Sequence, residues 1–394
     1  MLASFFGGKY PAGEILRDYG VIFPVAFLVS FVAAPVCRKL AWRYGIVDRP
    51  NETVKTHAAP TAYLGGVGIL AGLLAGLAAG CWLLGSGRIH VAAAKDSRAV
   101  FHTAYASWQM LAGIGLGAAI ACGVGVLDDL YDLSPGKKFL GQALAAGVLL
   151  AAGVMPNMAQ VLGHLGVEAP RGVQVLLSVP VVLFFILGAT NSLNLLDGLD
   201  GLCAGVTAII TTALALLAVG LASWEHSRVG DPMRLVLCLA LAGATLGFLP
   251  MNRHPARIFM GDAGSILLGF SAGTLMLLFA ETIGRWTVAG VIIFGLPILD
   301  TAVALVRRFV NKKPLFASDR GHIYDQLMDR GIPLGKTVAI CYVLAGLYAA
   351  AGLAVAQLRF RYAAASFAAV AAASAWVVWR KGFLQLPDKS GAKR

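Results

Sequence analysis

Charged residues are scarce in this sequence. Asp, Glu, Lys and Arg make up 13% of the 394 residues and hydrophobic residues 58%, whereas an ordinary soluble domain is about a quarter charged. This composition excludes a water-soluble globular protein. Apolar runs long enough to cross a bilayer as helices recur along the whole chain, with short polar segments between them. The sequence therefore predicts an all-α, polytopic transmembrane helical bundle.

Cysteine is also rare, and the six cysteines show neither a CxxC pair nor the Cys/His spacing of a metal site. They lie in or next to apolar runs, so we interpret them as small packing residues. The sequence shows no convincing internal repeat, no low-complexity linker and no change in composition that would divide it. We therefore expect a single integral membrane domain over residues 1–394.

Hydropathy predicts about eleven spans. They cover residues 20–37, 64–85, 107–127, 139–155, 173–190, 202–221, 235–250, 264–280, 287–305, 337–357 and 362–379. With the N-terminus outside, 21 of the 32 Lys and Arg residues fall in the inner segments 38–63, 128–138, 251–262, 306–336 and 380–394. This positive-inside bias predicts a cytoplasmic C-terminus and a multi-pass protein of the cell (inner) membrane. It also accounts for the net charge of +12, so we do not expect nucleic acid as a partner.

Polar residues that are costly inside a membrane collect in five clusters at the ends of the spans. The clusters lie in segments 38–63, 128–138, 191–201, 251–262 and 306–336. Counting the crossings places all five on the predicted cytoplasmic side. Because clusters so far apart in the sequence share one side, we expect them to form one site.

Two adjacent carboxylates, Asp128 and Asp129, end the third predicted span. Holding two carboxylates together in a low-dielectric site favours a cation or a proton between them, although a solvated loop start is the plainer interpretation. Asp262 lies next to a glycine at the start of the eighth span, where the backbone can approach an anion or a metal closely. We therefore take Asp262 as a candidate metal ligand.

Four polar side chains recur at intervals of three between two apolar spans: Asn191, Asn194, Asp197 and Asp200. This spacing drifts across the face of an α-helix but lines up along a tighter 3₁₀-like turn, which neighbouring glycines would permit. A packing role is hard to sustain, because each group would need a hydrogen-bond partner in lipid. The pattern favours a binding function.

Several stretches, in this order, carry a resemblance to a known family: residues 127–132 (LDDLYD) with Lys138, 191–202 (NSLNLLDGLDGL), 255–265 (PARIFMGDAGS) and 319–322 (DRGH). The chain resembles the polyprenyl-phosphate N-acetylhexosamine-1-phosphate transferases of glycosyltransferase family 4. The bacterial undecaprenyl-phosphate N-acetylglucosamine-1-phosphate transferases are the branch it is most similar to. The resemblance runs from about residue 49 to residue 330.

The resemblance implies a role for each matching residue. Asn194 and Asp262 would hold Mg²⁺, with Mn²⁺ as a substitute, Asp128 and Asp129 would lie by the lipid phosphate, and Lys138 would contact phosphate. A uridine pocket would contain Asp197, Gly198, Leu199, Asp200, Asn252 and Phe259. By itself Phe259 is better explained as an interfacial anchor, but the resemblance implies that it stacks on uracil. Arg320 and His322 would hold the donor pyrophosphate or sugar, His322 with a catalytic role, and Lys55 and Asn191 are further candidates for substrate contacts.

The implied reaction moves N-acetylhexosamine 1-phosphate, GlcNAc 1-phosphate first, from a UDP-sugar to polyprenyl (undecaprenyl) phosphate and releases UMP. It would be the first membrane step of a cell-envelope polysaccharide such as lipopolysaccharide or teichoic acid. A phosphate monoester has a second pKa near 6, so the acceptor needs little help from a base. Our hypothesis is that Asp128 and Asp129 position the acceptor and the metal. The sequence leaves open whether the chain acts as a homodimer.

Two departures from the family pattern bear on the donor sugar. The sequence Gly-His-Ile-Tyr-Asp at residues 321–325 keeps one histidine where bacterial relatives commonly have His-Ile-His-His, so Tyr324 and Asp325 replace two histidines. Residues 60–63 (PTAY) lack a second proline and a basic residue that relatives often carry before the glycine pair.

Two other functions are weighed against this one. A phospho-N-acetylmuramoyl-pentapeptide transferase shares the Asp pair, DGLDG and FMGD, but typically has a His-His-Phe-Glu-like stretch where this chain has DRGH. A secondary transporter would place its acidic groups near the midplane, often in repeated halves, whereas here they lie at one side. We rank the first alternative second and the transporter as remote.

Overall fold

The computed structural model describes residues 11–48, 60–86, 97–164, 166–225, 230–280, 284–313 and 321–384. Its helices are α2 (Ala12–Tyr19), α3 (Ile22–Tyr44), α4 (Gly65–Gly85), α5 (Ser97–Tyr131), α6 (Pro135–Ala151), α7 (Met158–His164), α8 (Arg171–Leu196), α9 (Leu202–Glu225), α10 (Gly230–Asn252), α11 (Gly261–Ala280), α12 (Arg285–Ile293), α13 (Gly295–Val310), α14 (Ile323–Asp329), α15 (Leu334–Val355) and α16 (Phe360–Arg380). Two strands of two residues each, β1 (Val47–Asp48) and β2 (Thr61–Ala62), pair antiparallel.

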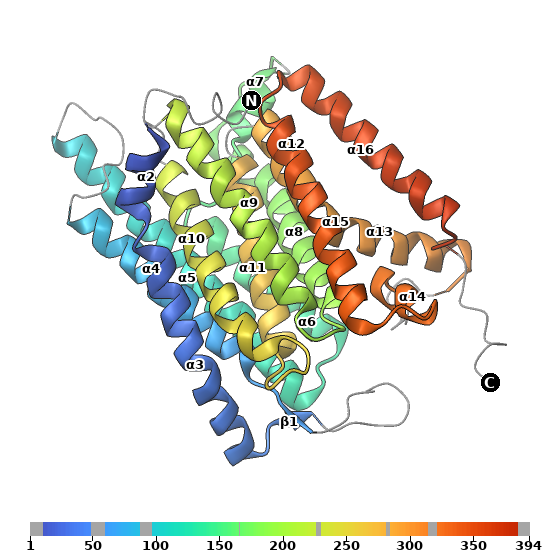
Figure 1. Ribbon diagram of the computed structural model, residues 1–394. Helices are drawn as coiled ribbons and strands as arrows, with labels where there is room; N and C mark the ends of the chain where they lie inside the picture. Colours follow the sequence, from blue (N-terminus) through green and yellow to red (C-terminus); the bar gives the residue numbers. More distant parts are fainter. Residues whose placement is uncertain are drawn as a thin grey trace.

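Long helices run roughly side by side through the molecule (Figure 1). Within the described ranges, nine helices are long and apolar enough to cross a membrane, and α12 with α13 would make a tenth. This confirms the predicted all-α, polytopic membrane fold. The predicted span 139–155 corresponds to α6, which has 17 residues. The count of eleven spans and their orientation stay predictions.

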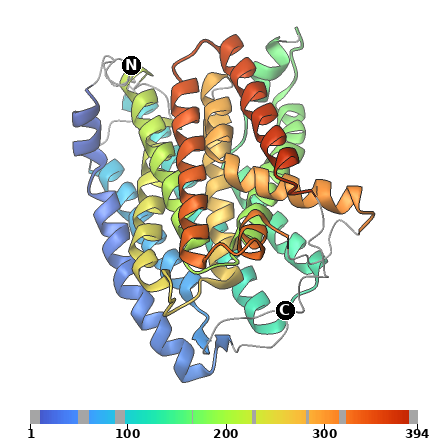
Figure 2. The same cartoon turned by 45° about the vertical axis from the view of Figure 1, so that its right-hand side comes forward.

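The predicted single span 287–305 is bent in the structure. Helix α12 ends at Ile293, and α13 continues at an angle of 67° to it. Gly295 and Pro297 explain the break, because glycine loosens the backbone and proline cannot donate a helical hydrogen bond. Figure 2 shows α13, in orange, crossing the direction of the neighbouring helices and projecting from the bundle.

Helix α13 is polar on its inner face and apolar on its outer face. Asp300 and Arg307 are fully buried against the protein, whereas Phe309 is 76% exposed and Val310 62% exposed. A surface helix of a soluble protein has the opposite arrangement. The outer face of α13 therefore suits contact with lipid, in agreement with the membrane fold.

Helix α11 forms the centre of the bundle, and α4, α5 and α8 pack against it. Every residue of α11 except Asp262 is buried. Glycines make the close contacts possible: a Cβ atom at Gly125 of α5 would collide with the backbone of Asp262 and Ala263. The packing therefore fixes the first turn of α11, with Asp262 on it, against the end of α5.

The strand pair extends this end of the bundle. Ala62 bridges to Ile258, and the backbone N–H of Phe259 donates to the carbonyl of Ala62 over 2.9 Å. The N–H of Gly65 in turn donates to the carbonyl of Phe259 over 2.9 Å. The chain before α4 and the chain before α11 are thus tied together where α11 begins.

Candidate active site

Described residues from each of the five polar segments meet near one end of the bundle, the lower end in Figure 1. Lys138 joins Asp128 to Asp262 at the start of α11. Asn194 at the end of α8 also contacts Asp262, and Ala62 reaches the loop before α11. Tyr324 of α14 joins by donating its hydroxyl to the carbonyl of Leu195 over 3.2 Å. Within the described residues, polar groups of the segments 128–138, 191–201, 251–262 and 306–336 therefore come together, whereas Lys55 and His57 of the first cluster lie outside the described residues.

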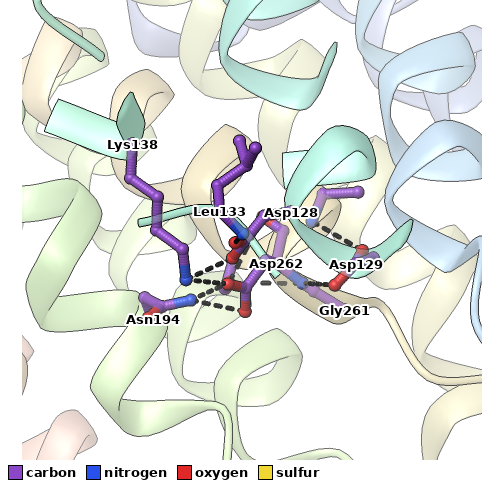
Figure 3. A network of polar contacts seen from close by, with 9 residues as sticks. Asp128, Asp129, Leu133, Lys138, Asn194, Gly261 and Asp262 are labelled. Carbon is purple, nitrogen blue, oxygen red and sulfur yellow. Dashed lines mark hydrogen bonds and ion pairs between the residues drawn. The ribbon is translucent and has the colours of Figure 1, made fainter. Parts of the chain in front are cut away.

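Lys138 lies between two carboxylates. Its Nζ pairs with Asp128 and, at 3.0 Å, with Oδ2 of Asp262. Figure 3 shows the lysine side chain extending from α6 toward both acidic groups. The other oxygen of Asp128 accepts the N–H of Leu133 over 2.8 Å, which fixes this carboxylate at the end of α5. Asp128 is thus held by a cation on one side and by the backbone on the other.

Asp129 faces the N-terminus of α11. Its Oδ1 accepts the backbone N–H of Asp262 over 2.8 Å, and its Oδ2 accepts that of Ala263 over 3.1 Å (Figure 3). Both donors are among the N–H groups that a helix leaves unpaired at its start, where the helix dipole favours negative charge. Gly261 has φ +67° and borders the Asp129 carboxylate, where a side chain would collide.

Asn194 and Asp262, the predicted metal ligands, are direct neighbours. Nδ2 of Asn194 donates to Oδ1 of Asp262 over 2.8 Å and to Oγ of Ser265 over 3.0 Å. Within the described ranges, no three His, Cys, Asp or Glu side chains form a ready-made metal cage. Mg²⁺ commonly takes only one or two protein carboxylates and completes its shell with water and substrate phosphates. The two side chains fit such a site.

The four residues spaced by three divide between a helix and a turn. Asn191 and Asn194 lie on the last turns of α8, which remains α-helical to Leu196. Asp197 and Asp200 lie in the turn that follows, where the N–H of Asp197 donates to the carbonyl of Asn194 over 3.3 Å. The predicted 3₁₀-like geometry is therefore confined to the end of the helix. Nδ2 of Asn191 donates to the carbonyl of Leu187 over 2.7 Å, so this amide is partly used within α8.

Two residues predicted to line the uridine pocket also join two loops. Oδ2 of Asp200 lies 2.7 Å from Nδ1 of His254 and accepts the N–H of Ala256 over 3.0 Å. Asn252 accepts the N–H of Gly201 over 3.2 Å and donates to the carbonyl of Ile258 over 3.0 Å. These bonds hold the turn after α8 against the loop before α11, a structural role that the spacing did not reveal.

Phe259 has an aromatic neighbour, Tyr63. Their ring centroids are 6.1 Å apart and the rings meet edge to face at 88°. Burial, followed by the charges of Asp129, Asp197 and Asp262, raises the pKa of Tyr63, which therefore stays neutral. Tyr63 stands in the stretch that departs from the family pattern, and this departure was the only sequence signal for it.

The turn residue Gly198 lies beside α14, and its neighbour Leu199 packs against the hydrophobic core. A Cβ atom at Gly198 would collide with the ring of Tyr324, and that ring stacks on the imidazole of His322 with centroids 5.6 Å apart. Nδ1 of His322 lies 2.7 Å from Oδ2 of Asp300, a residue that no motif indicated. Lys55 and Arg320 lie outside the described residues.

The site carries a surplus of negative charge. Burial alone would lower the pKa of Lys138. Hydrogen bonds and charges from Asp128 and Asp262 outweigh this effect, so the pKa of Lys138 is raised. Burial, together with the charges of Asp262 and Asp129, raises the pKa of Asp197 well above its usual value. Lys138 pairs with Asp128 and Asp262, and the charges of Asp129 and Asp197 act on the same cluster. Such a cluster favours a bound cation.

Comparison with known proteins agrees with this architecture. The model of "Glycosyl transferase family 4" matches residues 111–280. The "Probable undecaprenyl-phosphate N-acetylglucosaminyl 1-phosphate transferase" of Bacillus subtilis (strain 168) is 33% identical over 83% of this chain and 82% of its own length. The "Decaprenyl-phosphate N-acetylglucosaminephosphotransferase" of Mycobacterium tuberculosis (strain ATCC 25618 / H37Rv) is 30% identical over 86% and 82%. The "Phospho-N-acetylmuramoyl-pentapeptide-transferase" of Geobacillus kaustophilus (strain HTA426) is 29% identical over 75% and 83%.

A polytopic helical bundle with these relatives and this polar end defines an integral membrane phosphotransferase. The resemblance of the motifs is thereby confirmed over most of the chain. The protein belongs to glycosyl transferase family 4.

Proposed function

We propose that this protein transfers N-acetylglucosamine 1-phosphate from UDP-N-acetylglucosamine to polyprenyl phosphate and releases UMP. The observation that carries the proposal is the cluster at the end of the spans, in which Lys138 pairs with Asp128 and Asp262, and Asn194 donates to Asp262. A lipid phosphate reaches such a place from the bilayer, and a soluble nucleotide reaches it from the aqueous side. The two relatives named as polyprenyl-phosphate N-acetylglucosamine phosphotransferases support the same donor and acceptor classes.

The chemistry is a displacement at phosphorus. An oxygen of the lipid phosphate attacks the phosphorus that bears the sugar, a new P–O bond forms, and the P–O bond to UMP breaks. The C–O bond of the sugar stays intact, so the anomeric configuration is retained. One pyrophosphate linkage replaces another, and the reaction therefore runs backwards with UMP.

The protein's acidic groups are already engaged, which fits a positioning role. Asp128 is paired with Lys138, and Asp129 accepts two backbone N–H groups of α11. The acceptor phosphate is largely dianionic at neutral pH and needs no strong base. Lys138 supplies a positive charge for phosphate oxygens at the place where the spans end.

Magnesium is part of the proposal. Asp262 and Asn194 are the residues that would hold it, since oxygen ligands suit Mg²⁺ and the carboxylate surplus attracts a cation. When bound, the ion would neutralise charge on the donor pyrophosphate. Asn194 contacts Asp262 through its amide, which presents nitrogen or oxygen depending on its rotation.

The site faces the cytoplasm in this proposal. The support is the distribution of Lys and Arg, of which 21 of 32 fall in the predicted inner segments. Labelling of single cysteines in intact cells tests this orientation. A cysteine at Lys137, exposed beside the site, should react with a membrane-impermeant maleimide only after the cells are opened.

Purified protein in detergent tests the reaction itself. With Mg²⁺, radiolabelled UDP-N-acetylglucosamine and undecaprenyl phosphate, we expect label in the lipid and release of UMP. EDTA should abolish transfer and added Mg²⁺ or Mn²⁺ should restore it. Asp262→Asn should be inactive, whereas Asp329→Asn, a change at an exposed residue of α14, should retain activity.

UDP-N-acetylmuramoyl-pentapeptide provides the comparison substrate. Preferential transfer from this donor would assign the protein to the pentapeptide reaction and overturn the proposal. Labelled UMP should also exchange into UDP-N-acetylglucosamine in the presence of lipid-linked product. Failure of this exchange in an active enzyme would contradict the direct displacement.

A further inference from the structure

Asp300 is a buried carboxylate that lies outside the recognised motifs. It sits on the inner face of α13 and is fully buried. Its Oδ2 lies 2.7 Å from Nδ1 of His322, and its Oδ1 accepts the backbone N–H of Ile323 over 2.7 Å. Both oxygens therefore bind the chain at the start of α14. An ionised carboxylate only accepts hydrogen bonds, so Nδ1 of His322 carries a hydrogen in this pair.

The pairing leaves one ring nitrogen of His322 for another contact. Nε2 takes no part in this pair, and the His322 side chain also forms a capping box with Asp325 in the first turn of α14. The imidazole is fixed in two further ways: it is 5% exposed, and it stacks on Tyr324 at an interplanar angle of 12°. Tyr324 donates its hydroxyl to the carbonyl of Leu195, the neighbour of Asn194. His322 is thus held beside the turn that follows α8.

We propose that Asp300 is a positioning residue that orients His322 toward the UDP-sugar. The inference rests on the proposed function, because it assigns the nitrogen Nε2 to the donor substrate. Asp300 fixes the hydrogen on Nδ1 and compensates the charge of an imidazolium, whose Nε2–H donates to an anionic oxygen of the donor. The chemical class recognised at this point is a nucleoside-diphosphate sugar.

A purely structural role is the competing interpretation, since Asp300 also receives the first N–H of α14. Asp300→Asn separates the two roles. The amide oxygen of asparagine still accepts the N–H of Ile323, as asparagine caps helices about as well as aspartate. Its NH₂ group, however, donates toward Nδ1 and turns the ring into the other tautomer, with no compensating charge. The cap and the position of the ring are kept, and the positive charge of the imidazole is lost.

Steady-state kinetics of the purified full-length enzyme test the proposal. Asp300→Asn should lower kcat/KM for UDP-N-acetylglucosamine by about 100-fold, while the KM for undecaprenyl phosphate changes by less than about twofold. The melting temperature of Asp300→Asn should stay close to that of the unaltered protein. Asp329→Asn, at the exposed end of α14, serves as the matched control and should leave the kinetics unchanged.

A double-mutant cycle with His322→Ala identifies the route of the effect. If Asp300 acts through His322, the double variant should be no slower than His322→Ala alone. Independent, additive losses would overturn the proposal, and so would equal effects on donor and lipid or a loss of thermal stability alone. An unaltered protein that transfers no sugar phosphate would refute the proposed function. An active protein with a normal Asp300→Asn variant would refute only the positioning role.

Discussion

Asp129 caps α11, the helix that carries Asp262 in its first turn: its carboxylate accepts the backbone N–H of Asp262 over 2.8 Å and that of Ala263 over 3.1 Å. The two acidic residues are 133 positions apart in the chain. A negative charge at the N-terminus of a helix is stabilised by the helix dipole and by unpaired N–H groups. The contact therefore fixes the position of the first turn of α11, which carries Asp262.

Asp129→Asn tests this cap. The amide offers one acceptor oxygen in place of two and carries no charge, so α11 loses part of its N-terminal partner. We expect transfer activity to fall by at least about 100-fold and thermal stability to decrease. The measurement is initial rate and melting temperature in detergent. Rescue of the rate at high pH would instead indicate that Asp129 acts as a base.

Gly125→Ala tests the close packing of α5 on α11. The added methyl group meets the backbone of Asp262 and Ala263, which cannot move aside as a side chain can. We expect a loss of about 1–3 kcal/mol of stability and a clear drop in activity, although no polar group is removed. Gly123→Ala is the matched control, because open space surrounds this position on the same helix. Unchanged stability and activity of Gly125→Ala would show that α5 and α11 are further apart than in the structure.

Lys138→Met tests the cation between the two carboxylates. The change leaves the nearly buried side chain of Asp128 without its charged partner, at a cost of about 2–3 kcal/mol in stability. Activity should fall strongly, because the positive charge for phosphate oxygens is lost as well. Lys137→Met provides the control, since this neighbour is exposed. Equal activities of the two variants would contradict the assignment.

Gln326→Leu tests how α14 is attached. Nε2 of Gln326 donates to the carbonyl of Gly321 over 2.8 Å and to that of Phe383 over 2.9 Å. Removing these buried bonds should cost about 1–3 kcal/mol and raise the KM for the UDP-sugar, because α14 follows directly on His322. Gln357→Leu, which loses only a bond to the carbonyl of Leu353 in α15 at 3.3 Å, should change neither quantity. The melting temperature and the KM for the UDP-sugar are measured for both variants.

Some features of the fold could be predicted because they are local properties of the chain. The apolar runs predicted membrane-crossing helices, since a bilayer sets the length and polarity of any segment that crosses it. The polar clusters fall at the ends of these runs for the same reason. The bend at Phe294 was missed, because the run over residues 287–305 is apolar on both sides of the break and only the Gly-Leu-Pro sequence marks it.

The partners of the polar groups could not be predicted. Lys138 and Asp262 are 124 positions apart, and no periodic pattern connects them. Asp300 is a single charge within the apolar run 287–305, and its pairing with His322 depends on the bend that turns α13 toward α14. The roles of Asp200 and Asn252 in joining two loops also depend on which loops happen to be adjacent.

The sequence by itself determined that this protein is a membrane helical bundle of glycosyl transferase family 4, with acidic and amide residues at the ends of its spans. Only the tertiary structure decided which residues meet, that Asp129 caps α11, and that Asp300 holds His322. The physical reason is that hydrophobicity acts on each segment separately, whereas hydrogen bonds and ion pairs act over about 3 Å and depend on how the helices pack.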